Sequence, residues 1–253
     1  MLTSQRKRLI LEQLTREGQV RAKDLSIQFD VSEDTIRRDL RELAAEGELQ
    51  RVHGGALPAS GATATFAERK SLRLDSKKKV AKKGAGLIST GQVVIIDGGT
   101  TTAELVTFLP YDLNITVVTH SPGIALALVD HPHIEVILIG GRLFKHSVVA
   151  TGTATIESIA AIHADLFFMG VTGIHAQAGL TTGDYEEASV KRAFSRRAAE
   201  TIVLASAEKI NAASPYVIGD MSLANIVVLE EDADPALVQA LNDAGVAVVK
   251  ANP

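Results

Sequence analysis

The stretch "VSEDTIRRDLREL", Val31–Leu43, decides the fold of the first part of the chain. Ile36, Leu40 and Leu43 recur at helical spacing and predict one buried stripe. Ser32 is a favoured N-cap residue, so a helix is expected from there to about residue 45. Because the stripe faces inward, four polar side chains must turn toward other faces: Thr35, Arg37, Arg38 and Arg41.

Two further helices are predicted upstream of this one. Leucine and isoleucine spacing favours a helix over Gln5–Thr15, which Gly18 ends, and a second helix over Ala22–Phe29. Three side chains of the second helix are expected to point inward: Leu25, Ile27 and Phe29.

The segment "ELQRVHGGALP", residues 48–58, predicts a pair of short strands, or wing. Two helices joined by a tight turn and followed by a wing indicate a winged helix-turn-helix, whose second helix enters the major groove of DNA. Arginine pairs there with guanine and neutralises phosphate. A solvated, purely structural arginine face is the alternative. The expected DNA-binding residues are Ser32, Thr35, Arg37, Arg38, Arg41, Arg51 and His53.

The charge is distributed unevenly along the 253 residues. Residues 1–83 contain 18 lysines and arginines against 12 aspartates and glutamates, a net charge of +6. Residues 84–253 contain 8 against 18, a net charge of −10. A basic front on an acidic body favours a nucleic-acid-binding module joined to a second domain, and chance is the alternative.

Composition limits the class of protein. With 46% hydrophobic and 22% charged residues, the chain can bury a sizeable core. It has no apolar run long enough to span a membrane and no signal peptide at its start, which predicts a cytoplasmic protein without membrane contact. Because there is no cysteine, disulfides, thiolate metal sites and cysteine nucleophiles are excluded.

The connection between the two parts is expected to be a linker. Residues 57–75 are rich in alanine, serine, threonine and glycine and show little hydrophobic periodicity. We therefore expect a winged helix-turn-helix domain over residues 1–56, a linker over 57–75 and a second, larger α/β domain over 76–253. Five lysines follow on the first helix of the larger domain, as a solvated face or as added phosphate contacts: Lys77, Lys78, Lys79, Lys82 and Lys83.

Short apolar runs alternate with helical segments through the rest of the chain. The predicted strands are "QVVIID", "ITVVTH", "IEVILIGG", "DLFFMG", "TIVLAS", "NIVVLE" and "GVAVVK". The predicted helices cover Thr102–Phe108, Gly123–Val129, Thr153–Ile162, Tyr185–Arg197 and Ala236–Ala244. This alternation favours a mainly parallel sheet covered on both faces, with ligands binding beyond the carboxyl ends of its strands.

The first of these strand ends, "IIDGGTTTAEL", Ile95–Leu105, predicts a phosphate cradle. Paired glycines let the backbone approach an anion, and hydroxyls and amides gather where the next helix begins. A plain strand-to-helix turn is the alternative, and the motif specifies neither a nucleoside triphosphate nor a dinucleotide. The candidate residues are Gly98, Gly99, Thr100, Thr101 and Thr102, with Asp97 as a holder of sugar hydroxyls or as a base.

Other strand ends repeat this pattern in "THSPG", "GGR" and "GVTG". They contribute His120, Gly141, Arg142 and Gly170 as further effector-binding candidates. In "GDYEEASVKRAF" and "ASAEK" the candidates are Glu187, Lys191 and Lys209. The alternatives are a structural histidine, a surface salt bridge for the arginine, and a helix-stabilising pair for the glutamate and lysine four residues apart.

We find no constellation that defines an enzyme. The seven histidines show no metal-ligand spacing on one helix, and no nucleophile stands beside a base in any motif. The sequence therefore predicts no catalytic residue, no metal and no cofactor.

The motifs of this sequence resemble those of the DeoR family of bacterial transcription regulators over essentially the full length of the chain. "VSEDTIRRDLREL" followed by "RVHGGA" is similar to the family's winged helix-turn-helix signature. "DGGTTT", "GGR", "ADLFFMGVTG" and "EEASVKRAF" resemble its second domain. Two positions depart from the family: Ser206 stands where an aspartate is usual, and His120 where an asparagine is usual.

The resemblance implies a repressor with a C-terminal domain related in fold to ribose-5-phosphate isomerase. It implies that this domain binds a phosphorylated sugar or similar metabolite and thereby changes affinity for double-stranded operator DNA of a carbohydrate catabolic operon. A homo-oligomer, dimer or tetramer, is expected on a repeated or palindromic site. The alternative is a sugar-phosphate isomerase-like enzyme with a fused DNA-binding domain.

Overall fold

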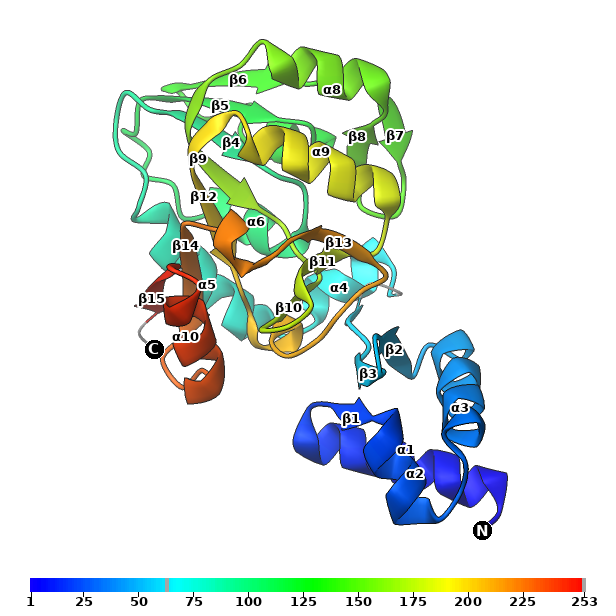
Figure 1. Ribbon diagram of the computed structural model, residues 1–253. Coiled ribbons are helices and arrows are strands. Elements are labelled where there is room, and N and C mark those ends of the chain that lie inside the picture. The colour runs from blue at the N-terminus through cyan, green and yellow to red at the C-terminus, as the bar shows by residue number, and fades with distance from the viewer. Residues whose placement is uncertain (62–63, 252–253) are drawn as a thin grey trace.

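The computed structural model describes residues 1–61 and 64–251 and shows two bodies joined by a short connection (Figure 1). The smaller, N-terminal body contains three helices and three short strands. Its helices are α1 (Thr3–Glu17), α2 (Ala22–Phe29) and α3 (Glu33–Ala45). Its strands are β1 (Val20–Arg21), β2 (Leu49–Val52) and β3 (Gly55–Pro58).

The helix predicted from the opening stretch is confirmed as α3. The Ser32 hydroxyl accepts a hydrogen bond from the amide of Thr35 at 3.2 Å and caps the helix. Ile36, Leu40 and Leu43 are buried in the core of the N-terminal body. The expected inward position of one α2 side chain is wrong, because Ile27 is 72% exposed. Leu25 and Phe29 fill the core from the same helix.

A buried ion pair joins the first and third helices of this body. Arg6 of α1 donates from Nε to Asp39 Oδ2 at 2.5 Å and from Nη2 to Oδ1 at 3.1 Å. Arg6 is 4% exposed and Asp39 is fully buried, so the two charges compensate each other in the core. The apolar spacing of α1 and α3 gives no signal for this pair.

The wing is a three-stranded sheet in the order β1-β3-β2. Its two longer strands were predicted, whereas β1 has only two residues and shows no pattern. The turn between β2 and β3 uses Gly54 at a φ of +78°, a left-handed conformation that glycine adopts without strain. A Cβ at Gly55 would lie 1.9 Å from the carbonyl oxygen of Val20, so only glycine lets β3 approach β1 this closely.

The segment predicted as a linker contains regular structure. β3 extends to Pro58, and helix α4 (Phe66–Ser71) lies within residues 57–75. A capping box starts α4, because the Thr65 hydroxyl accepts from the Glu68 amide while the Glu68 carboxylate accepts from the Thr65 amide. Residues 62 and 63 of the expected linker, and residues 252 and 253 at the end of the expected second domain, lie outside the described residues.

The larger body is built on a seven-stranded parallel sheet in the order β15-β14-β12-β9-β4-β5-β6. Its strands are β4 (Val93–Ile96), β5 (Ile115–Thr119), β6 (Ile134–Leu138), β9 (Ala164–Met169), β12 (Ala198–Leu204), β14 (Ile226–Glu230) and β15 (Ala247–Ala251). Each of these strands overlaps a predicted apolar run, and β12 begins three residues before its run. The prediction of a mainly parallel sheet is thereby confirmed.

Helices cover both faces of this sheet (Figure 1). One face packs against α5 (Leu74–Ala85), α6 (Thr100–Val106) and α7 (Pro122–Ala127). The other packs against α8 (Thr153–Ala160), α9 (Tyr185–Ser195) and α10 (Pro235–Asp243). Burial on both faces explains why the strands are nearly continuous runs of valine, isoleucine and leucine.

Two smaller antiparallel sheets were not predicted. One is the hairpin β7 (Arg142–Phe144) and β8 (Val149–Thr151). The other has the order β10-β11-β13 and contains β10 (Gly173–His175), β11 (Gly179–Thr182) and β13 (Tyr216–Gly219). Two short 3-10 helices, η2 (Ala207–Lys209) and η3 (Met221–Leu223), complete this body.

Candidate functional site

A pocket lies where the strand order of the parallel sheet reverses. From β4 the chain proceeds to β5 and β6 on one side, then returns to place β9 on the other side of β4. Such a switch point leaves a crevice beyond the carboxyl ends of the two central strands. Gly98 and Gly99, which follow β4, line this pocket together with Gly170 and Val171, which follow β9.

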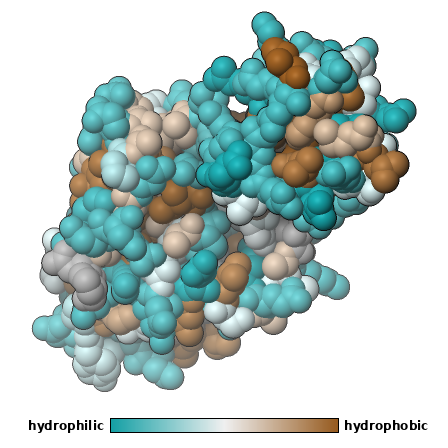
Figure 2. All heavy atoms as spheres, turned by 90° about the horizontal axis from the view of Figure 1, so that it is seen from below, coloured by the Kyte–Doolittle hydropathy of each residue, from teal (hydrophilic) through white to brown (hydrophobic). Residues whose placement is uncertain are grey.

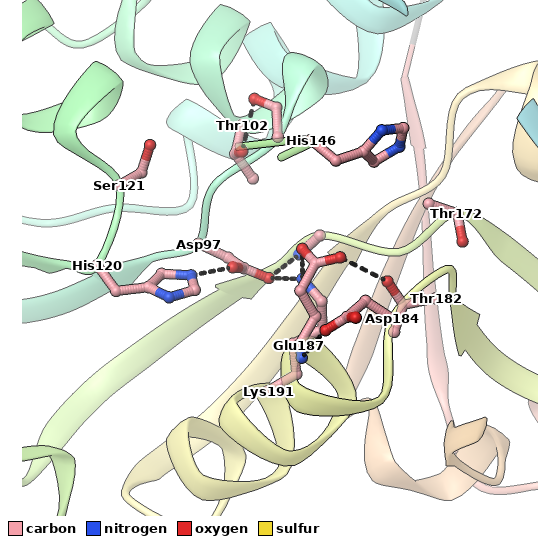
Figure 3. Close-up of polar contacts among 12 residues, drawn as sticks. Asp97, Thr102, His120, Ser121, His146, Thr172, Thr182, Asp184, Glu187 and Lys191 are labelled. Carbon is pink, nitrogen blue, oxygen red and sulfur yellow. Dashed lines mark hydrogen bonds and ion pairs between the residues drawn. The ribbon is translucent and has the colours of Figure 1, made fainter. Parts of the chain in front are cut away.

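A buried polar cluster supports the floor of the crevice (Figure 3). Asp97 is fully buried and accepts from His120 Nε2 at 2.7 Å, Lys191 Nζ at 2.6 Å and the Gly170 amide at 2.8 Å. The other ring nitrogen of His120, Nδ1, lies 2.7 Å from the carbonyl oxygen of Ala150. Both oxygens of Asp97 are therefore occupied by donors within the protein.

The charges of this cluster stabilise one another. Burial alone would raise the pKa of Asp97, but the charge of Lys191 and the hydrogen bond from His120 lower it to about 2. Burial would likewise lower the pKa of Lys191, and the carboxylates of Asp97 and Glu187 outweigh it, so this pKa is raised. Asp97 and Lys191 are thus held as an ion pair.

The wall of the pocket contains the glycines and threonines that start α6. A Cβ at Gly98 would lie 2.0 Å from the side chain of Val149, and Gly99 has a φ of +146°, so both positions require glycine. Thr101 is buried, and its hydroxyl accepts from Lys209 Nζ at 2.8 Å. Lys209 also donates to the carbonyl oxygen of Leu204 at 3.2 Å.

Lys209 is a buried cation among other cations. Burial lowers its pKa to about 8, with Glu208 opposing the change and the charges of Lys77, Lys191 and Arg69 adding to it. An anion bound among these side chains would favour the charged form of Lys209. The pocket therefore has the electrostatics of an anion site.

Two of these cations come from outside the predicted site. Arg69, on α4, donates from Nη2 to the carbonyl oxygen of His146 at 2.7 Å. Lys77, on α5, is 1% exposed, donates to the carbonyl oxygen of Arg69 and lies 3.7 Å from Glu208 Oε1. Lys77 was expected on a solvated face or as an added phosphate contact, and the solvated face is wrong for this residue because its side chain is buried. Gly61 and Leu72 also line the pocket, so the connection between the two bodies forms part of its wall.

The structure brings together most of the predicted effector-binding residues. Those that line the pocket are Gly98, Gly99, Thr100, Thr101, Thr102, Gly170, Glu187, Lys191 and Lys209. Asp97 and His120 lie beneath the pocket and do not line it. Arg142 and Gly141 lie apart from it, because the Arg142 side chain is 64% exposed and forms an ion pair with Glu186.

The predicted DNA-binding residues lie on the surface of the N-terminal body. Arg37, Arg38 and Arg41 are exposed along α3, and Arg37 donates to Glu33 at 2.8 Å. Arg51 and His53 are exposed in the wing and line one side of a groove whose other side belongs to the larger body. Figure 2 shows a mostly hydrophilic surface on the face that contains the N-terminal body.

Two general features complete the site description. Among residues 1–61 and 64–251, no group of three histidine, aspartate or glutamate side chains is placed to hold a metal ion. Within the same described ranges, every helix is too short or too polar to cross a membrane.

Comparison with known protein families gives two matches. The family described as DeoR-like helix-turn-helix domain matches residues 6–60, and the family described as DeoR C terminal sensor domain matches residues 73–231. The chain is 32% identical to the HTH-type transcriptional regulator GlpR of Haloferax volcanii over 98% of each chain. It is 30% identical to the glycerol-3-phosphate regulon repressor of Escherichia coli K12, over 96% of this chain and 97% of that protein.

Among solved structures, the full-length sorbitol operon regulator SorC of Klebsiella pneumoniae aligns with 97% of this chain and 96% of its own. Its TM-score is 0.41 and its sequence identity 13%. Ribose 5-phosphate isomerase A of Methanocaldococcus jannaschii aligns with 55% of each chain at a TM-score of 0.41 and 18% identity. These scores are too low to support a functional argument.

Proposed function

This chain belongs to the DeoR family of transcriptional regulators, and we propose that it is a repressor whose affinity for operator DNA responds to a phosphorylated metabolite bound in the pocket. The excess of cations that line the pocket carries this proposal. Arg69, Lys77, Lys191 and Lys209 line the pocket against Glu187 and Glu208, and Asp97 already neutralises Lys191 from below. A phosphate group would balance the remaining positive charge and accept the hydrogen bonds of the threonine hydroxyls.

A sugar or polyol phosphate is the ligand class that we propose. The pocket combines cations with the hydroxyls of several threonines and two carboxylates, groups that suit a phosphate and a chain of hydroxyls. One relative is a glycerol-3-phosphate regulon repressor, and its name supports a polyol phosphate as the ligand of this chain. The regulated genes would then be those of a carbohydrate pathway.

Operator DNA is the proposed partner of the N-terminal body. Its exposed arginines lie on a helix preceded by a second helix and followed by a wing, which is the arrangement that places such a helix in the major groove. We propose the division into residues 1–56 for DNA binding, 57–75 for the connection and 76–253 for effector binding. A homo-oligomer would place two such modules on paired half-sites.

Thermal unfolding of the full chain tests the ligand class. We expect phosphorylated sugars and polyols to raise the melting temperature and their unphosphorylated counterparts to leave it unchanged. Ligand at 100 times its Kd stabilises a protein by about 2.7 kcal/mol. Lys209→Met should reduce this response, whereas Lys83→Met, which changes an exposed lysine on α5, should not. Equal stabilisation by the unphosphorylated compounds would contradict the proposal.

A further inference from the structure

The segment that follows the wing, residues 58–60, forms backbone hydrogen bonds with the larger body. Directly after β3, Ala59 forms a parallel bridge with Ala213. The Ser60 amide donates to the Ala213 carbonyl oxygen at 3.1 Å, and the Ala213 amide donates to the Pro58 carbonyl oxygen at 3.2 Å. The end of the wing is thus held by the residues that precede β13.

Three hydroxyls connect this attachment to the ligand pocket. Ser60 Oγ lies 2.5 Å from Ser214 Oγ, and Ser214 Oγ lies 2.7 Å from Thr172 Oγ1. Ser60 and Ser214 are 7% and 5% exposed, so solvent contributes little to these hydrogen bonds. Thr172 lines the pocket. A continuous line of hydroxyls therefore runs from the pocket to the chain that carries the wing.

One end of this line has a backbone acceptor. Thr172 Oγ1 donates to the carbonyl oxygen of Thr181 at 3.2 Å. A hydroxyl has one proton to donate, so while Thr172 donates to Thr181 it accepts from Ser214. Ser214 is fixed further because its amide donates to Thr181 Oγ1 at 3.0 Å.

A ligand in the pocket competes for one end of the line. A phosphate oxygen is a strong acceptor, and Thr172 can donate to it only by giving up the carbonyl oxygen of Thr181. Where the Thr172 side chain turns about its Cα–Cβ bond to bring the hydroxyl to the ligand, Oγ1 moves relative to Ser214 Oγ, and the hydrogen bond between these two hydroxyls changes. The contact of Ser214 with Ser60 then changes with it. The change needs no movement of the parallel sheet.

The same serine also borders the wing. The groove beside β2 is lined on one side by Arg51 and His53 and on the other by the β10–β11 turn and the segment around Ser214. Both wing residues are proposed DNA contacts. A shift of the segment at Ser214 therefore alters where these two side chains are held relative to α3.

We infer that Ser214 is a positioning residue that couples occupancy of the ligand pocket to the position of the wing, through its hydrogen bonds to Thr172 and Ser60. This inference rests on the proposed function, because it requires an anionic ligand beside Thr172. Ser214 itself does not line the pocket. Its loss should break the coupling while leaving ligand binding in place.

The test uses the full chain and inorganic phosphate as the probe. Because the chain has no cysteine, Glu48→Cys in the wing and Glu157→Cys on α8 introduce the only thiols for a pair of spin labels. Labelled protein is diluted into unlabelled protein, so that the measured distances lie within one chain. Phosphate binding is followed separately by thermal shift, at constant ionic strength.

We expect phosphate to shift the label distance in the parent protein. In Ser214→Ala, phosphate should still raise the melting temperature, but the population with the shifted distance should fall roughly 2- to 13-fold, the effect of one neutral hydrogen bond. Ser214→Thr, which unlike Ser214→Ala keeps a hydroxyl, should show the same distance shift as the parent protein. Ser222→Ala, at an exposed serine bonded only to Asp220, should behave as the parent.

The outcomes test the role of Ser214 and the proposed ligand class separately. A full distance shift in Ser214→Ala, or a parent protein that binds phosphate without any shift, would overturn the role of Ser214 and leave the ligand class intact. A parent protein that phosphate does not stabilise would overturn the proposed function and this inference with it. If Ser214→Ala fails to fold, Ser60→Ala removes the other end of the line and is expected to lose the shift in the same way.

Discussion

The two bodies of this molecule place their cations in opposite ways. On α3, three arginines are exposed within five residues of sequence. In the pocket, Lys191 and Lys209 are buried, and the cations that meet there are as distant in sequence as Arg69 and Lys209. Exposed cations can approach a large polyanion from outside, whereas buried ones must enclose a small anion. The difference therefore separates the proposed DNA-binding surface from the proposed ligand pocket.

Burial also changes what each charge requires from its neighbours. An exposed arginine remains hydrated, and its ion pair with a neighbouring carboxylate contributes little to stability. A buried cation depends on the polar groups around it, which are the Asp97 carboxylate at 2.6 Å for Lys191 and the Thr101 hydroxyl at 2.8 Å for Lys209. In the N-terminal body only the Arg6–Asp39 pair is of this buried kind among the described residues, and it lies away from the exposed arginines of α3.

The largest effect should follow from removing the buried carboxylate of the pocket. Asp97→Ala leaves Lys191 buried without its partner, and the loss should be about 3–5 kcal/mol in the free energy of unfolding. Chemical denaturation of the full chain measures this. Glu186→Ala removes the partner of exposed Arg142 and should cost at most about 1 kcal/mol. Equal losses in the two variants would contradict the comparison between buried and exposed charges.

The Asp97 carboxylate should also make the free energy of unfolding depend on pH in the acid range. The pKa of Asp97 is lowered from its ordinary 3.8 to about 2 in the folded protein. A group with a lowered folded pKa stabilises the protein above its unfolded pKa. This contribution should be complete above about pH 4 and decline as the pH falls toward 2, and it should be missing from the pH profile of Asp97→Ala.

The next effect concerns the exposed arginines. Arg37→Ala, Arg38→Ala and Arg41→Ala should each weaken binding to a selected operator duplex, by about 1–3 kcal/mol where the side chain pairs with a base. Their free energies of unfolding should change by no more than about 0.5 kcal/mol, because the side chains are exposed. Arg8→Ala, at an exposed arginine of α1, is the matched control. If all three variants bind the operator as tightly as the parent protein, α3 is not the recognition helix.

The two bodies should also differ in their response to alkaline pH. Lys209 has a pKa lowered to about 8 by burial and by neighbouring cations, so it loses its charge as the pH rises through 8. We expect affinity for a phosphorylated ligand to fall about tenfold between pH 7 and pH 9, while the ligand's own second ionisation, near pH 6, is already complete. Arginine keeps its charge throughout, so α3 should contribute no such dependence.

Calorimetric titration across this range measures the ligand affinity. Lys209→Met should bind more weakly and lose the dependence between pH 7 and pH 9. An unchanged slope in that variant would assign the titration to another group.

The sequence predicted the parallel sheet well because each of its strands is buried on both faces. A run such as "QVVIID" has few other structural explanations. The strands β7, β8, β10 and β11 contain three or four residues each and lie in small sheets, so they show neither a long apolar run nor alternation. Glycines and threonines at strand ends were a sufficient signal for six of the residues that line the pocket: Gly98, Gly99, Thr100, Thr101, Thr102 and Gly170.

The rest of the pocket depends on tertiary contacts that a sequence pattern does not record. Lys77 is buried while Lys78 and Lys79 beside it are exposed, and three adjacent lysines look alike in the sequence. A signal was nevertheless present, because Lys77 shares the helix face of Val80, Ala81 and Gly84 at spacings of three, four and seven residues. Arg69 had no such signal, since α4 buries no complete side chain.

The smallest effect is expected at Ile27, where apolar character alone misled the prediction. It lies two residues from Leu25 on α2, so a helical period cannot turn both side chains into one core. Ile27→Lys should change the free energy of unfolding by no more than about 0.5 kcal/mol, because 72% of the residue is exposed. Leu25→Ala, at a fully buried position, should cost about 2–5 kcal/mol. Denaturation of both variants measures the contrast, and a comparable loss at Ile27 would show that this face of α2 is covered in the folded protein.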